Sequence, residues 1–105
     1  MQYRYTIILP VKYNDGKTIE PYKLDSALFD LMEIAIGFTA YESFGCYRMP
    51  DGTAKREPNI TVWTVADKAK MASLKNLCKL FAAMFRQESI FFAFSPISVD
   101  YIRGN

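Results

Sequence analysis

The spacing of apolar and polar residues predicts a strand near the N-terminus, followed by a connection. Residues from Tyr3 to Pro10 are rich in β-branched and aromatic types and stop at a proline, which favours a strand. Between residues 11 and 23 this pattern breaks into Asn14-Asp15-Gly16, a strong turn signal, and then Pro21. A connection about a dozen residues long is therefore expected.

Two segments repeat their apolar residues at steps of three and four, which predicts helices. The first runs from Leu24 to Ile36, with Asp25 or Ser26 available as N-cap and Gly37 available just past the last turn. The second begins after Asp67, a suitable N-cap, and its lysines fall off the apolar stripe, as is typical of a solvated helix face. That stripe consists of Met71, Leu74, Cys78, Phe81 and Phe85.

A β-hairpin is predicted between the two helices. Residues from Phe38 to Met49 alternate between aromatic and small or polar types and then meet the turn sequence Pro50-Asp51-Gly52. The chain can return as an antiparallel strand from Ile60 to Val65, so residues 53–58 would form a long, charged distal end. If the two strands pair around Asp51-Gly52, Arg56 and Glu57 face Tyr47 and Cys46.

The chain ends in a further strand, which completes the order strand, helix, strand, strand, helix, strand. Ile90 to Phe94 is almost entirely apolar, as in a strand covered on both faces, and Ile97 to Ile102 alternates after Ser95-Pro96, giving one bent edge strand or two short ones. The order predicts one α+β domain over residues 1–105 with a ferredoxin-like βαββαβ fold, an antiparallel sheet carrying both helices on one face. Two such sheets could form a dimeric αβ barrel.

Composition makes the uncovered face of that sheet the main question. Half of the 105 residues are hydrophobic and 15% are aromatic, so a face without helices would be too apolar to lie in water. If the helices cover Ile60 and Val62, Trp63 points to the open face; if they cover the Trp63 side, the two aliphatic residues are left there. We therefore expect a homodimer, or a ligand, to cover the open face.

Charge and missing residue types exclude several classes of function. The formal charge is +2, and the basic residues are scattered rather than clustered, which argues against a nucleic-acid partner. The sequence contains no histidine, so histidine-dependent nucleophiles and metal sites are excluded, and no phosphate-binding or dinucleotide-binding motif is present. We expect no cofactor, no metal site and no membrane partner; the short apolar run before Pro10 predicts a cytoplasmic protein, with Cys46 and Cys78 as ordinary thiols.

The hairpin and the end of the second helix carry the candidate site residues. Tyr47, Arg56 and Glu57 could line the rim of a pocket, or they could form a cross-strand stack on a solvated surface. Glu88, in Gln87-Glu88-Ser89, could pair with Glu57 as a second carboxylate, or could belong to a junction that hydrogen-bonds the helix end. With Trp63, these residues form the candidate ligand-binding set.

The same motifs resemble those of a family of small bacterial proteins of unknown function. The likeness rests on Gly45-Cys46-Tyr47-Arg48, Gly52, Arg56-Glu57 and a helix that ends in Arg86-Gln87-Glu88-Ser89-Ile90, and it spans roughly residues 39–102. The resemblance implies no reaction. Two hypotheses therefore stand: a non-catalytic homodimeric or partner-binding protein, and a small enzyme or ligand-binding protein of the dimeric αβ-barrel type with its site between the sheets.

Overall fold

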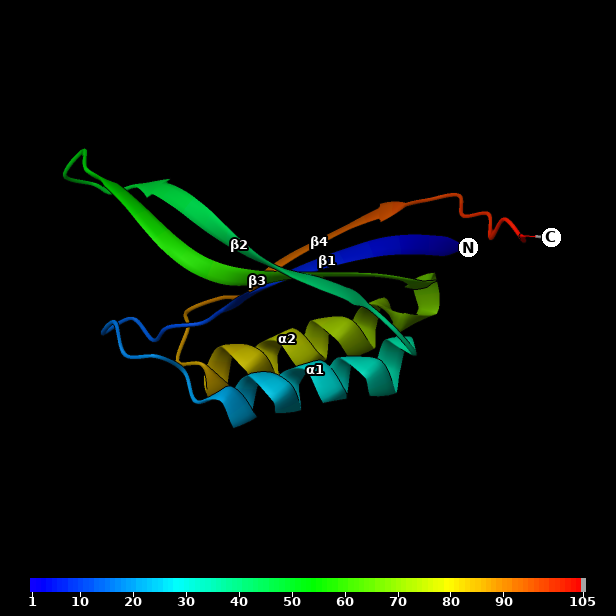
Figure 1. The fold of residues 1–105 in the computed structure, drawn as a ribbon, viewed down its shortest axis with the longest axis horizontal. Helices are drawn as coiled ribbons and strands as arrows, with labels where there is room; N and C mark the ends of the chain where they lie inside the picture. The colour runs from blue at the N-terminus through cyan, green and yellow to red at the C-terminus, as the bar shows by residue number, and fades with distance from the viewer. Residues whose placement is uncertain (105) are drawn as a thin grey trace.

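The computed structural model describes residues 1–104 as a four-stranded sheet with both helices packed on one face (Figure 1). The strands are antiparallel and lie in the order β2-β3-β1-β4. The α+β, ferredoxin-like fold predicted from the sequence is confirmed. In chain order the elements are β1 (Gln2–Pro10), α1 (Pro21–Ala35), β2 (Thr39–Arg48), β3 (Ala54–Asp67), α2 (Met71–Met84) and β4 (Phe91–Pro96).

The core lies between the sheet and the helices. Ile7 of β1 faces Val62 of β3, and both side chains are buried on the helix side of the sheet. Leu31 of α1 and Phe81 of α2 belong to the same buried cluster and form its helix side. Because side chains alternate along a strand, Trp63 points to the open face, which decides the alternative that the sequence left open.

The first helix is longer than its apolar pattern indicates. It begins at Pro21, a favoured first residue because proline's missing N–H is not needed there, so Asp25 and Ser26 lie inside the helix rather than at its cap. Its last helical residue is Ala35, and the positive φ that ends the helix, 67°, belongs to Ile36 at the C-cap and not to Gly37. Asp67 caps a short 3₁₀ helix, η1 (Lys68–Lys70), that leads into α2: its carboxylate accepts a hydrogen bond from the backbone N–H of Ala69 at 2.9 Å. The α-helix itself begins one turn later, with Lys70 at its N-cap position, so the predicted cap lies on the turn that precedes α2.

The hairpin is longer than predicted, and its register is shifted by one residue. The segment that we expected to be a charged loop belongs to β3, which starts at Ala54. Arg56 faces Cys46, and Glu57 faces Gly45, because a five-residue connection between Arg48 and Ala54 replaces the expected two-residue turn. Alternation along β3 places Arg56 on the helix side of the sheet and Glu57 on the open face, and the shifted register puts Tyr47, which faces Lys55, on the face of Glu57 instead of that of Arg56.

The predicted final strand is shorter and less covered than its apolar sequence indicates. β4 pairs only with β1, so it forms an edge of the sheet, and residues 97–104 add no second strand. Phe91 is 56% exposed, which makes the prediction of a strand covered on both faces wrong. Neither helix described in residues 1–104 has the length and apolarity needed to cross a membrane.

Candidate functional site

A polar row crosses the middle of the open sheet face. Ser43 of β2 donates a hydrogen bond to the side-chain oxygen of Asn59 on β3, and its hydroxyl lies 2.7 Å from that of Thr61. Asn59 and Thr61 are each only 8% exposed. Their hydrogen bonds join the two strands of the hairpin and satisfy polar groups that would cost stability if they were buried without a partner.

Tyr47 and Glu57 lie beside this row, where the hairpin leaves the body of the sheet. A Cβ atom built on Gly45 would lie 2.5 Å from the Tyr47 hydroxyl oxygen, so the tyrosine ring lies directly over the glycine. Gly45 in turn faces Glu57 across the ladder. Only glycine leaves room for this ring position, which brings the tyrosine hydroxyl next to the strand position of the carboxylate.

These two residues form part of the wall of a hollow with a volume of about 310 Å³. Its apolar side comes from β1 and β4, and its polar side from β3 and from the segment between α2 and β4. The hollow combines one carboxylate, one phenol, two amides and one hydroxyl with aliphatic and aromatic surface. The lining residues are Ile8, Pro10, Tyr47, Glu57, Pro58, Asn59, Gln87, Ser89 and Phe91.

The charge of the hollow depends on a single ion pair. Lys55 Nζ lies 2.9 Å from Glu57 Oε1, and both side chains are nearly half exposed. An ion pair in such a solvated position contributes little to stability, so a ligand cation can replace the lysine at low cost. Glu57 is thus available as the negative group of the hollow.

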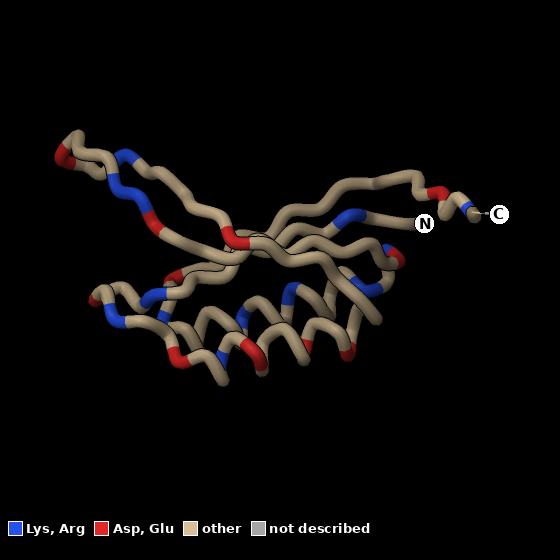
Figure 2. The backbone as a smooth tube through the Cα atoms, viewed as in Figure 1, with Lys and Arg blue, Asp and Glu red and all other residues tan. Residues whose placement is uncertain are grey.

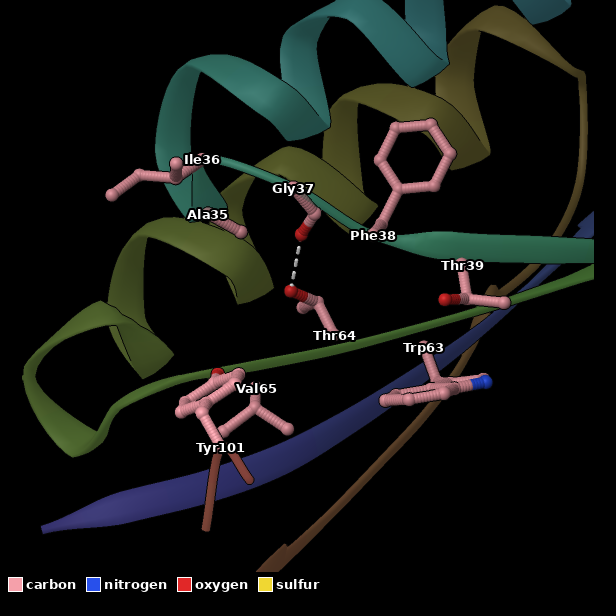
Figure 3. Close-up of a pocket in the computed structure, with 9 residues that line it drawn as sticks. All are labelled: Ala35, Ile36, Gly37, Phe38, Thr39, Trp63, Thr64, Val65 and Tyr101. Carbon is pink, nitrogen blue, oxygen red and sulfur yellow. Dashed lines mark hydrogen bonds between the residues drawn. The ribbon is translucent and has the colours of Figure 1, made fainter. Parts of the chain in front are cut away.

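A second hollow lies on the other side of the polar row, where α1 passes into β2 (Figure 3). Its volume is about 430 Å³, and Tyr101 and Trp63 lie along its open-face wall. The Arg4 guanidinium carbon lies 4.5 Å from the centre of the Trp63 ring, and the Thr64 hydroxyl donates a hydrogen bond to the Gly37 carbonyl. This hollow offers aromatic surface, and its lining includes no acidic side chain.

The structure brings only part of the predicted residue set together. Tyr47 and Glu57 share one hollow, whereas Trp63 lines the other. Arg56 projects to the opposite side of the sheet, with its guanidinium carbon 3.8 Å from the centre of the Phe44 ring. Glu88 lines a separate hollow against α2, so it forms no shared site with Glu57.

Several residues of the hollow were not singled out from the sequence. Asn59 is a buried polar residue on β3, and its position two residues after Glu57 placed it on the same face. Gln87 and Ser89 flank the predicted site residue Glu88 in the sequence. Ile8 and Phe91 face each other across β1 and β4, a pairing that no local pattern could have indicated.

Comparison with known proteins identifies relatives in fold only. No protein-family model and no curated protein matches the sequence. Among solved structures, the periplasmic divalent cation tolerance protein CutA from Archaeoglobus fulgidus is similar, with a TM-score of 0.71 and 13% identity over 96% of this chain and 88% of its own. A phage SAM lyase in complex with S-methyl-5′-thioadenosine gives a TM-score of 0.65 and 15% identity over 90% of this chain and 80% of its own. CutA1 from the psychrotrophic bacterium Shewanella sp. SIB1 gives a TM-score of 0.70 and 13% identity over 95% of this chain and 84% of its own.

Proposed function

We propose that this chain binds S-adenosylmethionine (SAM) in the Tyr47–Glu57 hollow and cleaves it to S-methyl-5′-thioadenosine. The observation that carries the proposal is the position of Tyr47, which lies over Gly45 and next to the strand position of Glu57. An aromatic ring and a carboxylate together suit a small organic cation, because both attract positive charge. The similarity in fold to a phage SAM lyase directs the choice of cation.

The remaining walls of the hollow match the other parts of this ligand. Ile8, Pro10 and Phe91 provide apolar surface against which an adenine ring can pack. Asn59, Gln87 and Ser89 provide amide and hydroxyl groups, which can hydrogen-bond ribose hydroxyls or the amino-acid part. The volume of about 310 Å³ lies at the lower end of the range for small-molecule sites.

The chemistry suits a chain that lacks histidine. In SAM the sulfonium sulfur carries a positive charge, and the α-carboxylate of the same molecule can attack the Cγ atom bonded to that sulfur. A C–O bond forms as the C–S bond breaks, its electron pair returns to sulfur, and the products are a neutral thioether and a lactone. No proton moves, so the protein needs only to fold the substrate and exclude water.

Glu57 and Tyr47 would act by positioning the substrate. The Glu57 carboxylate attracts the cationic groups, and the Tyr47 hydroxyl can donate a hydrogen bond to a substrate oxygen. The carboxylate and sulfonium charges of SAM cancel as the C–O bond forms. Water stabilises the separate charges more than the less charged transition state, so an apolar wall that displaces water favours the reaction.

The names of the CutA structures suggest a role with divalent cations, but the side chains of this chain give that role no support. In residues 1–104 no group of three or more acidic, cysteine or histidine side chains lies close enough together to hold a metal ion. Hard cations require several oxygen ligands at once. The Tyr47–Glu57 hollow contributes one carboxylate, which fits an organic cation better.

The decisive experiment is incubation of the purified protein with SAM, followed by chromatography and mass spectrometry of the products. We expect S-methyl-5′-thioadenosine to accumulate in proportion to protein. Glu57→Gln should reduce the rate at least tenfold and Tyr47→Phe about tenfold, on the order of one hydrogen bond to a charged group. Glu42→Gln and Tyr22→Phe are matched controls, because Glu42 lies on the helix side of the hairpin and Tyr22 is exposed on α1.

Absence of both product and saturable SAM binding would refute the proposal and favour the non-catalytic, partner-binding hypothesis. That hypothesis shares one expectation with the enzyme, namely that a second copy of the chain covers the open face. Tyr41 is 50% exposed there and Phe91 56%, as expected of a face that is buried in an oligomer. Light scattering that returned only the 12.1 kDa monomer at high concentration would contradict self-association.

A further inference from the structure

A basic hollow lies between the β1–α1 connection and the base of the hairpin. Its volume is about 220 Å³, and it is distinct from the Tyr47–Glu57 hollow, with which it shares only Glu57 and Pro58. Figure 2 shows basic positions on both the hairpin and the connection at this end of the molecule. The lining residues are Lys12, Tyr13, Asn14, Gly16, Lys55, Arg56, Glu57 and Pro58.

The lining of this hollow has more positive than negative charge. Lys55 pairs with Glu57, but among residues 1–104 neither Lys12 nor Arg56 has an acidic side chain within ion-pair distance. Two positive charges from segments more than forty residues apart in the sequence are therefore uncompensated on one small concave surface. Like charges that line one small surface repel each other, and an anion bound between them would offset that repulsion.

Arg56 is held in a position that leaves its N–H groups accessible. Its guanidinium carbon lies 3.8 Å from the centre of the Phe44 ring, so one flat face of the group packs on the aromatic ring. The N–H groups of a guanidinium lie in its plane, and stacking does not occupy them. The edge of the group remains available for the two parallel hydrogen bonds that phosphate oxygens accept.

The opposite wall is fixed before any ligand arrives. Tyr13 is 8% exposed; its hydroxyl donates to Glu20 Oε2 at 2.7 Å and accepts from Lys23 Nζ at 2.7 Å. The Tyr13 hydroxyl and, with a smaller effect, the Lys23 ammonium, which lies 3.0 Å from Glu20 Oε2, lower the pKa of the Glu20 carboxyl below its ordinary value. The neighbouring backbone forms a small hairpin, in which the N–H of Tyr13 donates to the carbonyl of Lys17 at 2.8 Å.

Between these walls the backbone of β3 lacks a strand partner on one side. The ladder between β1 and β3 ends where Pro10 faces Asn59, so residues 55–58 pair with β2 alone. Backbone N–H groups alternate between the two edges of a strand and Pro58 has none, so this segment can offer one or two N–H groups to an anion at its free edge. The hollow thus combines lysine and arginine charge with backbone donors.

From this arrangement we infer an anion site that takes a phosphate group, held by Arg56 and Lys12 against the free edge of β3. The volume is below that of ordinary drug-sized pockets, which suits one phosphate group, either free or at the end of a larger molecule. The inference does not rest on SAM cleavage, because Lys12 and Arg56 line no part of the Tyr47–Glu57 hollow.

Titration of the intact chain followed by NMR or calorimetry tests the site. Inorganic phosphate and adenosine monophosphate are the two probes, in separate titrations at low salt. We expect saturable binding that weakens as sodium chloride is added, because salt screens exposed charges. Tighter binding of the nucleotide would identify the phosphate as part of a larger ligand, and equal or tighter binding of phosphate would identify the free ion.

Charge-removing variants make the test specific. Arg56→Gln and Lys12→Gln should each weaken phosphate binding about tenfold, whereas Lys68→Gln, at the opposite end of β3, should leave it unchanged. Glu57→Gln should leave phosphate binding intact or tighten it while it reduces SAM cleavage, which separates this inference from the proposed function. The inference is overturned if phosphate shows no saturable binding, or if Lys68→Gln weakens binding as much as Arg56→Gln in proteins with unchanged melting curves.

Discussion

Replacing Gly45 by alanine tests whether the position of Tyr47 matters for function. The added Cβ would lie 2.5 Å from the tyrosine oxygen, whereas ordinary contacts begin at 3.4 Å, so the ring must move away. Tyr47 is 50% exposed, and its ring can swing into solvent without disturbing the core. Since alanine is favoured over glycine within strands by about 0.5–1 kcal/mol, the free energy of unfolding should change by no more than about 1 kcal/mol.

The functional effect should be measurable although the protein stays folded. A displaced Tyr47 cannot make its hydrogen bond to the ligand, a loss of about 0.5–1.5 kcal/mol, or roughly a two- to thirteenfold fall in kcat/KM for SAM cleavage. Gly37→Ala is the matched control, because no atom lies within 4 Å of a Cβ at that position. Product formation and thermal unfolding would be measured on both variants.

A double-mutant cycle shows whether the effect passes through the tyrosine. In a Tyr47→Ala background, Gly45→Ala should cause no further loss of activity, because the side chain that it displaces is absent. The reasoning is refuted if Gly45→Ala leaves kcat/KM at the wild-type value, or if it lowers activity equally with and without Tyr47.

Three further predictions concern the fold. Phe81→Ala should lower the free energy of unfolding by about 3–5 kcal/mol because Phe81 is buried in the core, whereas Lys75→Ala should change it by less than about 0.5 kcal/mol; equal effects in chemical denaturation would contradict the assigned helix face. Burial raises the pKa of the Cys78 thiol to about 11, so a thiol reagent at pH 8 should modify exposed Cys46 quickly and Cys78 only after unfolding, and two fast thiols would argue against this packing. Hydrogen bonds from the Ala69 backbone and the N-terminal amine lower the pKa of Asp67 in the folded state. The carboxylate therefore stabilises the fold above its unfolded pKa near 3.8, and this stabilisation is lost as the pH falls through the lower folded pKa. Asp67→Asn should flatten this part of a plot of the free energy of unfolding against pH, and an unchanged curve would exclude the effect.

The order of the elements and the core could be predicted from the sequence because both depend on local periodicity. The steps of three and four that mark Leu31 and Phe81 require only that a helix bury one side. The cap at Asp67 and the proline that ends β1 are likewise local signals. The predicted ends of helices and strands are less accurate where local signals compete. In α1, for example, the helix begins at Pro21, ahead of the predicted cap at Asp25.

The arrangement of the candidate site was decided by tertiary structure. A five-residue connection in place of a two-residue turn shifts the hairpin by one residue, and since side chains alternate along a strand, that shift put Tyr47 on the face that carries Glu57 and not on the face that carries Arg56. No local pattern records such a register. The contributions of Ile8 and Phe91 depend on β4 pairing with β1 across more than eighty residues of sequence, so only the folded sheet brings them to the same hollow as Glu57.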